Sequence, residues 1–354
     1  MSFLRDLLRR LRGEPPRPAG AAPPTPPRES AESPYRRPAE VPARAWPGPL
    51  DSLEGYEIVG TLESDGELYA RHLVVSPAAP ERRASVACFG TRGLDDQLFL
   101  VLVDEVRVLK RLDHPRIARL LDLGHEREVV WVLSEYPRGE TLESLVARIA
   151  AGAAPPSIDV AMAAFADFAE GLDAAHRERL DDGRPLGLRY PHLGPSSLLF
   201  GSEGPCQIVD WGVVELARAH RSLRDSGTPS AVLLLPELRF MAPEIVTGKV
   251  VGARADVFAL GVMLHELTTG STLFRANTDL GILENILKQE PLPPTRMVRG
   301  YPDELSRLVM RSLAKSTEAR LTAGELAAGL RTLLHARGVE DPSARVAAYL
   351  RQAG

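Results

Sequence analysis

Two short triplets constrain the fold of this chain more than any other feature of its sequence. An Asp-Trp-Gly triplet at 210–212 follows an apolar, strand-like run. An Ala-Pro-Glu triplet at 242–244 comes about thirty residues later. Either triplet alone carries little information, but the pair at this separation is specific. We therefore align the rest of the chain to these two positions.

The apolar pattern around the triplets changes along the chain from strand-like to helical. Strands are predicted where short apolar or alternating runs lie between turn residues, at 56–62, 67–75, 83–90, 116–124 and 128–136. Helices are predicted where apolar residues recur with helical spacing, at 96–112, 141–150, 157–179, 254–270, 303–313 and 323–338. This order predicts an α+β fold with two lobes: a five-stranded antiparallel sheet plus one helix, then a mainly helical lobe.

The predicted folded domain covers residues 53–336. Its N-lobe is expected over 53–135 and its C-lobe over 136–336, and a helical tail is expected over 337–354. Residues 14–50 are rich in Pro and Ala and poor in the β-branched and aromatic side chains that build a core. This composition predicts a disordered linker.

The first residues, 1–13, form a short basic amphipathic pattern. Phe3 and four leucines share one helical face, and arginines cover the other face. Two interpretations stay open for this segment. It is either a helix that contacts a membrane surface weakly, or docks on a partner, through residues 3–12, or a frayed end, because isolated helices this short are marginal.

On the two triplets and this order of elements, the chain resembles the eukaryotic-type Ser/Thr protein kinases of bacteria, over roughly residues 55–334. A kinase of this kind must anchor ATP, hold Mg²⁺, orient a hydroxyl group and stabilise charge on the transferred phosphoryl group. The resemblance gives each of these tasks an expected position in the sequence.

The positions that would hold a nucleotide are only partly kept. The glycine-rich loop lacks its middle glycine, and Glu63 and Asp65 bring negative charge to where phosphates would lie. The resemblance implies vestigial nucleotide-binding positions at Gly60, Gly66, Leu68, Ala87, Glu105, Glu135, Leu199 and Asp210. Among these, Leu68, Ala87 and Leu199 would enclose an adenine ring.

The strand lysine that would pair with the phosphates and with Glu105 is missing. Phe89 occupies its position, and an aromatic ring cannot neutralise phosphate. Because no lysine precedes Lys110, a substitute cation would have to be an arginine. The candidates are Arg71, Arg82 and Arg83.

The catalytic loop departs from the family pattern H-R-D-L-x-x-x-N most strongly. His192 replaces the aspartate that accepts the hydroxyl proton, and Ser197 replaces the asparagine that binds metal. Asp210 keeps its carboxylate, but Asp210 and Ser197 would make a weak site for Mg²⁺, which needs near-octahedral oxygen coordination. No catalytic residue is therefore intact at Phe89, His192 and Ser197. We expect His192 and Ser197 to line an open cleft, where their replacement by alanine costs little stability.

Residues that only hold the fold are kept. Glu244 and Arg320 match the buried ion pair of the family's large lobe, and Asp256 matches the carboxylate that braces the catalytic-loop backbone. A spine of stacked side chains would link the lobes through Leu109, Leu120, Tyr190 and Trp211. Scaffold positions are thus kept while chemical positions are lost, which favours a selected non-catalytic role.

Composition limits the other classes of function. A net charge of −4 and a pI near 6.1 give no reason to expect a nucleic-acid partner. Cys88 and Cys206 are too few and too far apart for a disulfide framework or a metal site, so buried reduced thiols are expected. The sequence shows neither an apolar run of membrane-spanning length nor a signal-peptide core, so we expect a cytoplasmic protein.

The leading interpretation is a catalytically impaired kinase-like protein, a pseudokinase. It would act as a signalling scaffold or an allosteric partner of other signalling proteins, such as an active kinase. It would need no cofactor and would bind ATP and Mg²⁺ weakly or not at all. Two alternatives stay open. One is a divergent active Ser/Thr kinase, or other nucleotidyl- or phosphotransferase, that uses Asp210, His192 and an arginine; the other is a nucleotide sensor that binds ATP without turnover.

Overall fold

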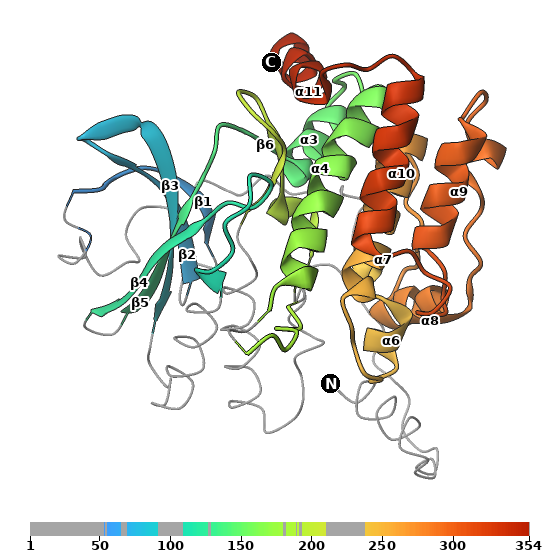
Figure 1. The fold of residues 1–354 in the computed structure, drawn as a ribbon, viewed down its shortest axis with the longest axis horizontal. Helices are drawn as coiled ribbons and strands as arrows, with labels where there is room; N and C mark the ends of the chain where they lie inside the picture. The colour runs from blue at the N-terminus through green and yellow to red at the C-terminus, as the bar shows by residue number, and fades with distance from the viewer. Residues whose placement is uncertain are drawn as a thin grey trace, which may run out of the picture. The chain divides into compact units, whose positions relative to one another are not determined.

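A five-stranded antiparallel sheet forms the first part of the fold (Figure 1). The computed structural model describes residues 53, 55–64, 69–90, 109–126, 129–179, 182–188, 190, 193–209 and 238–353. The sheet has the order β1-β2-β3-β5-β4, which confirms the predicted five-stranded sheet. Its strands are β1 (Glu57–Ser64), β2 (Tyr69–Ser76), β3 (Ala79–Gly90), β4 (Leu120–Glu126) and β5 (Val129–Glu135).

The two faces of this sheet differ in what they pack against. Successive side chains of a strand point to opposite faces, so β3 places Val86 and Cys88 on one face and Ser85 and Ala87 on the other. The first face carries a hydrophobic core that also includes Trp131 of β5. The second face carries Ala87, which the sequence assigns to the nucleotide.

In the N-lobe, one strand begins later than predicted and one predicted helix lies largely outside the described residues. The fourth strand begins at Leu120 and not at residue 116, because the residues before it pair elsewhere. Ile117 forms a parallel bridge with Ile208, and the Ala118 amide donates to the Ile208 carbonyl at 2.8 Å. The predicted helix over 96–112 falls largely outside the described residues, as do the segments 1–13 and 14–50.

The second part of the fold is mainly helical, as predicted. Its central helix is α4 (Ile158–Arg177), which begins at the N-cap Ser157 and is buried along most of its length. Figure 1 shows α10 running beside α4, and α7 and α11 also contact α4. The other helices are α3 (Leu142–Ala150), α6 (Pro243–Val246), α7 (Arg254–Thr269), α8 (Asp279–Lys288), α9 (Asp303–Ser312), α10 (Ala323–Ala336) and α11 (Pro342–Ala353).

Short elements complete this part of the chain. A three-stranded sheet joins β6 (Gly139–Thr141), β7 (Leu198–Gly201) and β8 (Gln207–Ile208). Single 3-10 turns occur at η2 (Pro195–Ser197), η4 (Leu238–Phe240) and η5 (Pro294–Arg296). Strand β8 lies in the strand-like run before the triplet at 210–212, whereas β6, β7, α6 and α8 were not predicted.

The end of the chain packs onto the helical part. The Tyr349 hydroxyl of α11 donates to the Ala154 carbonyl at 2.9 Å. The Arg148 guanidinium of α3 lies over the Tyr349 ring, 5.9 Å from its centre. Among the described residues, no helix combines the length and the apolar character that crossing a bilayer requires.

Candidate functional site

The candidate site lies where the first sheet meets the small sheet of the helical part. The segment before β4 reaches β8 through the Ile117–Ile208 bridge. The Glu135 amide at the end of β5 donates to the Arg119 carbonyl at 2.8 Å. These backbone bonds bring the end of β5 and the segment before β4 close to β8, which pairs with β7.

A small hydrophobic cluster forms the floor of this junction. Ala118, Leu199 and Val209 are buried together, and Tyr136, the residue after β5, packs against them. Leu199 is one of the residues that the sequence assigns to an adenine ring. It is 0% exposed in this structure. The apolar surface that this cluster would offer to an adenine ring is therefore not exposed to solvent.

Three of the predicted nucleotide positions lie in the first sheet. Gly60 lies in β1 opposite Leu73, and an added Cβ would meet no atom within 4 Å, so the structure does not require glycine there. Ala87 lies in β3 and is buried. A carboxylate oxygen of Glu135 accepts from the Arg119 amide at 3.2 Å. The remaining positions, Gly66, Leu68, Glu105 and Asp210, lie outside the described residues.

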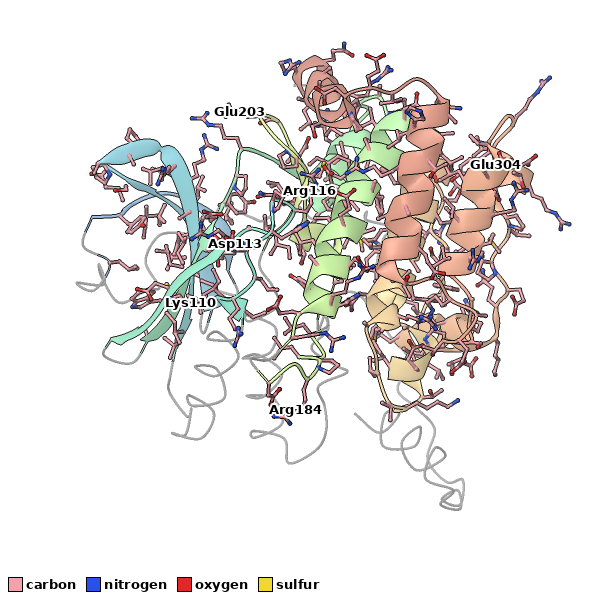
Figure 2. All side chains as sticks on the ribbon, viewed as in Figure 1. Lys110, Asp113, Arg116, Arg184, Glu203 and Glu304 are labelled. Carbon is pink, nitrogen blue, oxygen red and sulfur yellow. The ribbon has the colours of Figure 1, made fainter. Side chains whose placement is uncertain are left out.

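The position of the missing lysine belongs to β3. The backbone of Phe89 pairs with Tyr69 of β2 and Val130 of β5. Lys110, the first lysine of the chain, is exposed and pairs with Asp122 of β4 at 3.1 Å (Figure 2). Among the three arginines that could replace the lysine, Arg82 is exposed, Arg83 is half-buried and Arg71 is buried.

The prediction that Ser197 lines an open cleft is wrong. Ser197 is 7% exposed, and its Oγ accepts a hydrogen bond from the Tyr190 hydroxyl at 2.8 Å. The same hydroxyl lies 3.3 Å from the Val209 carbonyl oxygen. The sequence aligned Tyr190 with the family's histidine but did not show that its phenol reaches Ser197. His192, the other replaced position of this loop, lies outside the described residues.

Asp256 lies in α7 and holds the start of the catalytic loop. Its Oδ2 accepts from the Tyr190 amide at 2.9 Å and lies 2.8 Å from His176 Nε2 of α4. This geometry agrees with the bracing contact that the sequence predicts for Asp256. The contact of His176 was not predicted, because no spacing pattern joins the end of α4 to α7.

The Glu244–Arg320 ion pair of the sequence analysis is present. Arg320 Nη1 and Nη2 donate to the two carboxylate oxygens of Glu244 at 2.6 and 3.0 Å. Arg320 is 1% exposed and Glu244 6%. The pair joins α6 to the turn before α10.

The predicted spine is only partly described. Leu109 and Tyr190 are buried, and Leu120 at the start of β4 is half-buried. Trp211, its fourth member, lies outside the described residues. The stacking of the four side chains therefore stays a prediction.

Arg71 is a residue of this junction whose role the sequence did not define. Its guanidinium carbon lies 5.4 Å from the centre of the Tyr136 ring, and its Nη2 donates to Ser85 Oγ at 3.4 Å. The sequence offered Arg71 as a candidate substitute for the lysine, and strand alternation is compatible with a place on the same sheet face as Ala87, but neither predicts the contact with Tyr136.

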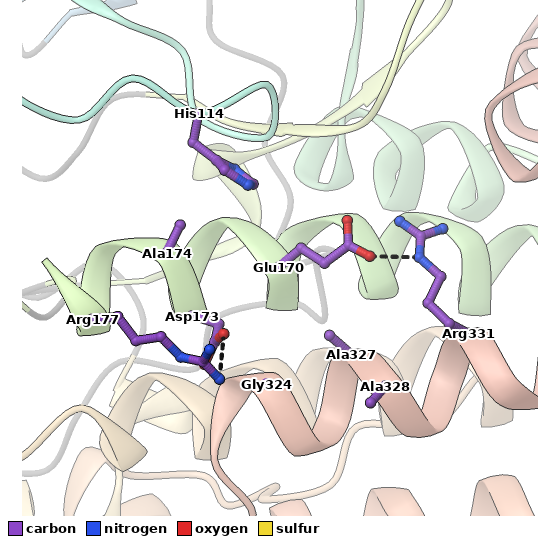
Figure 3. A pocket seen from close by; sticks show the side chains of 9 residues that line it. All are labelled: His114, Glu170, Asp173, Ala174, Arg177, Gly324, Ala327, Ala328 and Arg331. Carbon is purple, nitrogen blue, oxygen red and sulfur yellow. Dashed lines mark hydrogen bonds and ion pairs between the residues drawn. The ribbon is translucent and has the colours of Figure 1, made fainter.

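A separate cavity of about 450 Å³ lies between α4 and α10 (Figure 3). Charged side chains from both helices line it, and Glu170 pairs with Arg331 at 2.7 Å across it. This cavity contains none of the predicted site residues.

The junction between the two sheets, as far as it is described, thus offers buried apolar surfaces and polar groups that bond to one another. Asp256 and Ser197 already have hydrogen-bond partners within the protein.

Comparison with known proteins agrees with the alignment made on the two triplets. The family model described as "Protein kinase domain" matches residues 94–329, about two thirds of the chain. The match includes β4, β5 and the helical part as far as α10.

Individual curated relatives are bacterial. The chain is 31% identical over 232 residues to the tyrosine-protein kinase MasK of Myxococcus xanthus, with 65% of this chain and 35% of MasK covered. It is 33% identical over 245 residues to the serine/threonine-protein kinase PkaB of Streptomyces coelicolor, with 68% and 54% covered. For the serine/threonine-protein kinase PknB of Mycolicibacterium smegmatis the identity is 26% over 241 residues, with 67% and 36% covered. The chain therefore spans between about a third and a half of the length of these relatives.

Proposed function

Because the chain belongs to the protein kinase family, we propose that it is a catalytically impaired member that acts through protein contacts. It would serve as a signalling scaffold or as an allosteric partner of an active kinase. Phosphoryl transfer needs a cation on the phosphates, carboxylate and amide oxygens on Mg²⁺ and a base near the hydroxyl group. The sequence replaces the corresponding residues by Phe89, Ser197 and His192.

The observation that carries this proposal is the hydrogen bond between Tyr190 and Ser197. A metal ligand must present its oxygen to the cleft, with a free lone pair toward the ion. Ser197 Oγ instead accepts from the Tyr190 hydroxyl, and the residue is only 7% exposed. The replacement therefore supports internal packing in place of metal binding.

The retained contacts support the same proposal. The Glu244–Arg320 pair and the Asp256 contact with the Tyr190 amide stabilise the helical lobe without taking part in chemistry. A chain under no selection would be expected to lose both classes of residue. A partner surface, in contrast, requires the folded lobe and not the phosphotransfer residues.

A second candidate function is that of a divergent active kinase. It is favoured by the relatives, which are named as tyrosine- and serine/threonine-protein kinases. Such an enzyme would depend on Asp210 and His192, with an arginine in place of the lysine. A nucleotide sensor that binds ATP without turnover is the third candidate.

Calorimetric titration of the full chain with ATP separates the sensor from the scaffold. We expect weak or undetectable binding with and without Mg²⁺, because electrostatic anchoring of the phosphates is lost at Phe89. Mg²⁺-dependent affinity of micromolar order, or about −8 kcal/mol, would contradict the proposal. Asp210→Ala is the control, since a true metal-dependent site would lose its Mg²⁺ dependence in that variant.

A further inference from the structure

Arg71 lies on the sheet face that a nucleotide base would contact. In the register of β2 and β3, Arg71 is directly opposite Ala87, so the two side chains share a face. Val74 and Val86 belong to the opposite face and its hydrophobic core. Arg71 nevertheless is only 5% exposed. Its long, charged side chain is therefore buried between this face and the elements next to it.

Tyr136 is one of the residues that Arg71 contacts, besides Ser85. The guanidinium carbon lies 5.4 Å from the centre of the Tyr136 ring, a cation–π geometry. Below the ring, Tyr136 packs against the cluster of Ala118, Leu199 and Val209. A continuous series of neighbours thus runs from Ala87 through Arg71 and Tyr136 to Leu199. Ala87 and Leu199 are the residues that would sandwich an adenine ring.

The backbone next to the predicted adenine position, at the end of β5, offers few hydrogen-bond donors to a base. The Tyr136 amide already donates to the Arg83 carbonyl at 3.0 Å. The next residue, Pro137, carries no amide hydrogen. A base placed there could not accept a hydrogen bond from either of these two positions, which is unfavourable for its buried ring nitrogens.

We propose that Arg71 and Tyr136 fill the adenine site of this protein, so that it excludes nucleotides by occupying the base position. This inference rests on the proposed function, because the same alignment assigns Ala87 and Leu199 to the adenine ring. The inference goes beyond the proposed function, because nucleotides would then be excluded by the occupied space as well as by the missing lysine. It also assigns Arg71 a place at the base and not at the phosphates.

The test is titration of the full chain with adenosine, which lacks phosphates and so does not report on the missing lysine. We expect no saturable binding by the parent at millimolar adenosine. Arg71→Ala should bind at least about tenfold more tightly, because truncation opens the space above Tyr136. Arg71→Val is a second truncation that keeps strand propensity, in case the alanine variant does not fold. Arg71→Met removes the charge but fills the space, and it should behave like the parent.

Arg307→Ala is the control, since Arg307 is an exposed arginine of α9 that belongs to neither sheet. It should leave the titration unchanged. Absence of any gain in a folded Arg71→Ala or Arg71→Val variant would overturn the inference, and so would saturable adenosine binding by the parent. A parent that binds ATP and loses that affinity in Arg71→Ala would make Arg71 a phosphate anchor, which also overturns it. None of these results requires phosphoryl transfer, whose detection would contradict the proposed function instead.

Discussion

Tyr190 connects several buried groups through hydrogen bonds. Its hydroxyl is held between Ser197 Oγ at 2.8 Å and the Val209 carbonyl oxygen at 3.3 Å, and its amide is held by Asp256. All of these groups are buried, so each hydrogen bond replaces contacts that water would otherwise supply. Tyr190 thus links its own segment to η2, to the segment after β8 and to α7.

A double-mutant cycle tests this contact. Tyr190→Phe and Ser197→Ala should each lower the free energy of unfolding by about 1–2 kcal/mol, because each leaves a buried polar group without its partner. The double variant should cost less than the sum, with a coupling of about 0.5–1.5 kcal/mol. Denaturant unfolding measures all four proteins. Ser316→Ala, which removes an exposed hydrogen bond to Glu318, is the control. Strictly additive effects would show that the two hydroxyl groups do not interact.

At the scale of the elements, α4 organises the helical part through a buried acidic residue. Asp167 is 2% exposed, and Arg116, Arg331 and the Cys206 amide surround its carboxylate at 2.7, 2.5 and 2.8 Å. Burial of a carboxylate is costly unless it is paired in this way. Figure 2 shows Arg116 reaching the region of α4 from the segment before β4. Four segments of the chain therefore depend on one ionic cluster.

Removal of one cation from this cluster should be measurable. Arg331→Ala deprives Asp167 and Glu170 of a shared partner, while Arg116 remains. We expect a loss of about 2–3 kcal/mol in the free energy of unfolding, below the roughly 3–5 kcal/mol for a buried charge left wholly unpaired. The control is Arg337→Ala, because Arg337 directly follows α10 and pairs with Asp159 near the start of α4, but at the surface. It should cost about 1 kcal/mol or less. Equal effects would show that burial does not strengthen the cluster.

The elements also show which parts of the fold the sequence could predict. The five strands and the long helices carry their own apolar periodicity, so pattern alone located them. Strands β6 and β7 are too short to show an alternating pattern, and they form because distant segments pair, as Gly139 does with Gly201. Helix α8 was missed because Gly281 in its first turn weakens the helical signal.

The sequence predicted which residues belong to the site, but not which of their side chains touch one another. Alignment on the two triplets identified Asp256, Glu244 and Arg320 and gave their partners or roles. It did not reveal that Tyr190 reaches Ser197 or that Arg71 reaches Tyr136. Those contacts depend on side-chain length and direction across strands and loops, which spacing along a sequence does not determine.

For the whole molecule, Arg320 links segments that are far apart in sequence. Besides Glu244 of α6, it donates to the Arg254 carbonyl of α7 at 2.9 Å and to the Ala314 carbonyl at 3.0 Å. Its guanidinium also lies over the Phe258 ring, 5.0 Å from the centre. The helical lobe thus closes around one buried cation that has no catalytic task.

Arg320→Ala should therefore be among the most destabilising single changes in the chain. It leaves Glu244 buried without its partner, and we expect a loss of about 3–5 kcal/mol in the free energy of unfolding. Arg307→Ala, which breaks the exposed Arg307–Glu304 pair of α9, should cost about 1 kcal/mol or less. Denaturant unfolding of both variants beside the parent provides the comparison. A silent Arg320→Ala variant would refute the structural role of the pair.

The proposed loss of phosphoryl transfer from a retained kinase scaffold can be measured by incubating the full chain with labelled ATP, with Mg²⁺ and separately with Mn²⁺, and with generic protein acceptors. We expect no transfer of label to the chain itself or to any acceptor, because the cation, base and metal-ligand positions are occupied by Phe89, His192 and Ser197. Transfer of label that disappears in an Asp210→Ala variant would contradict the claim and identify the protein as an active, divergent kinase.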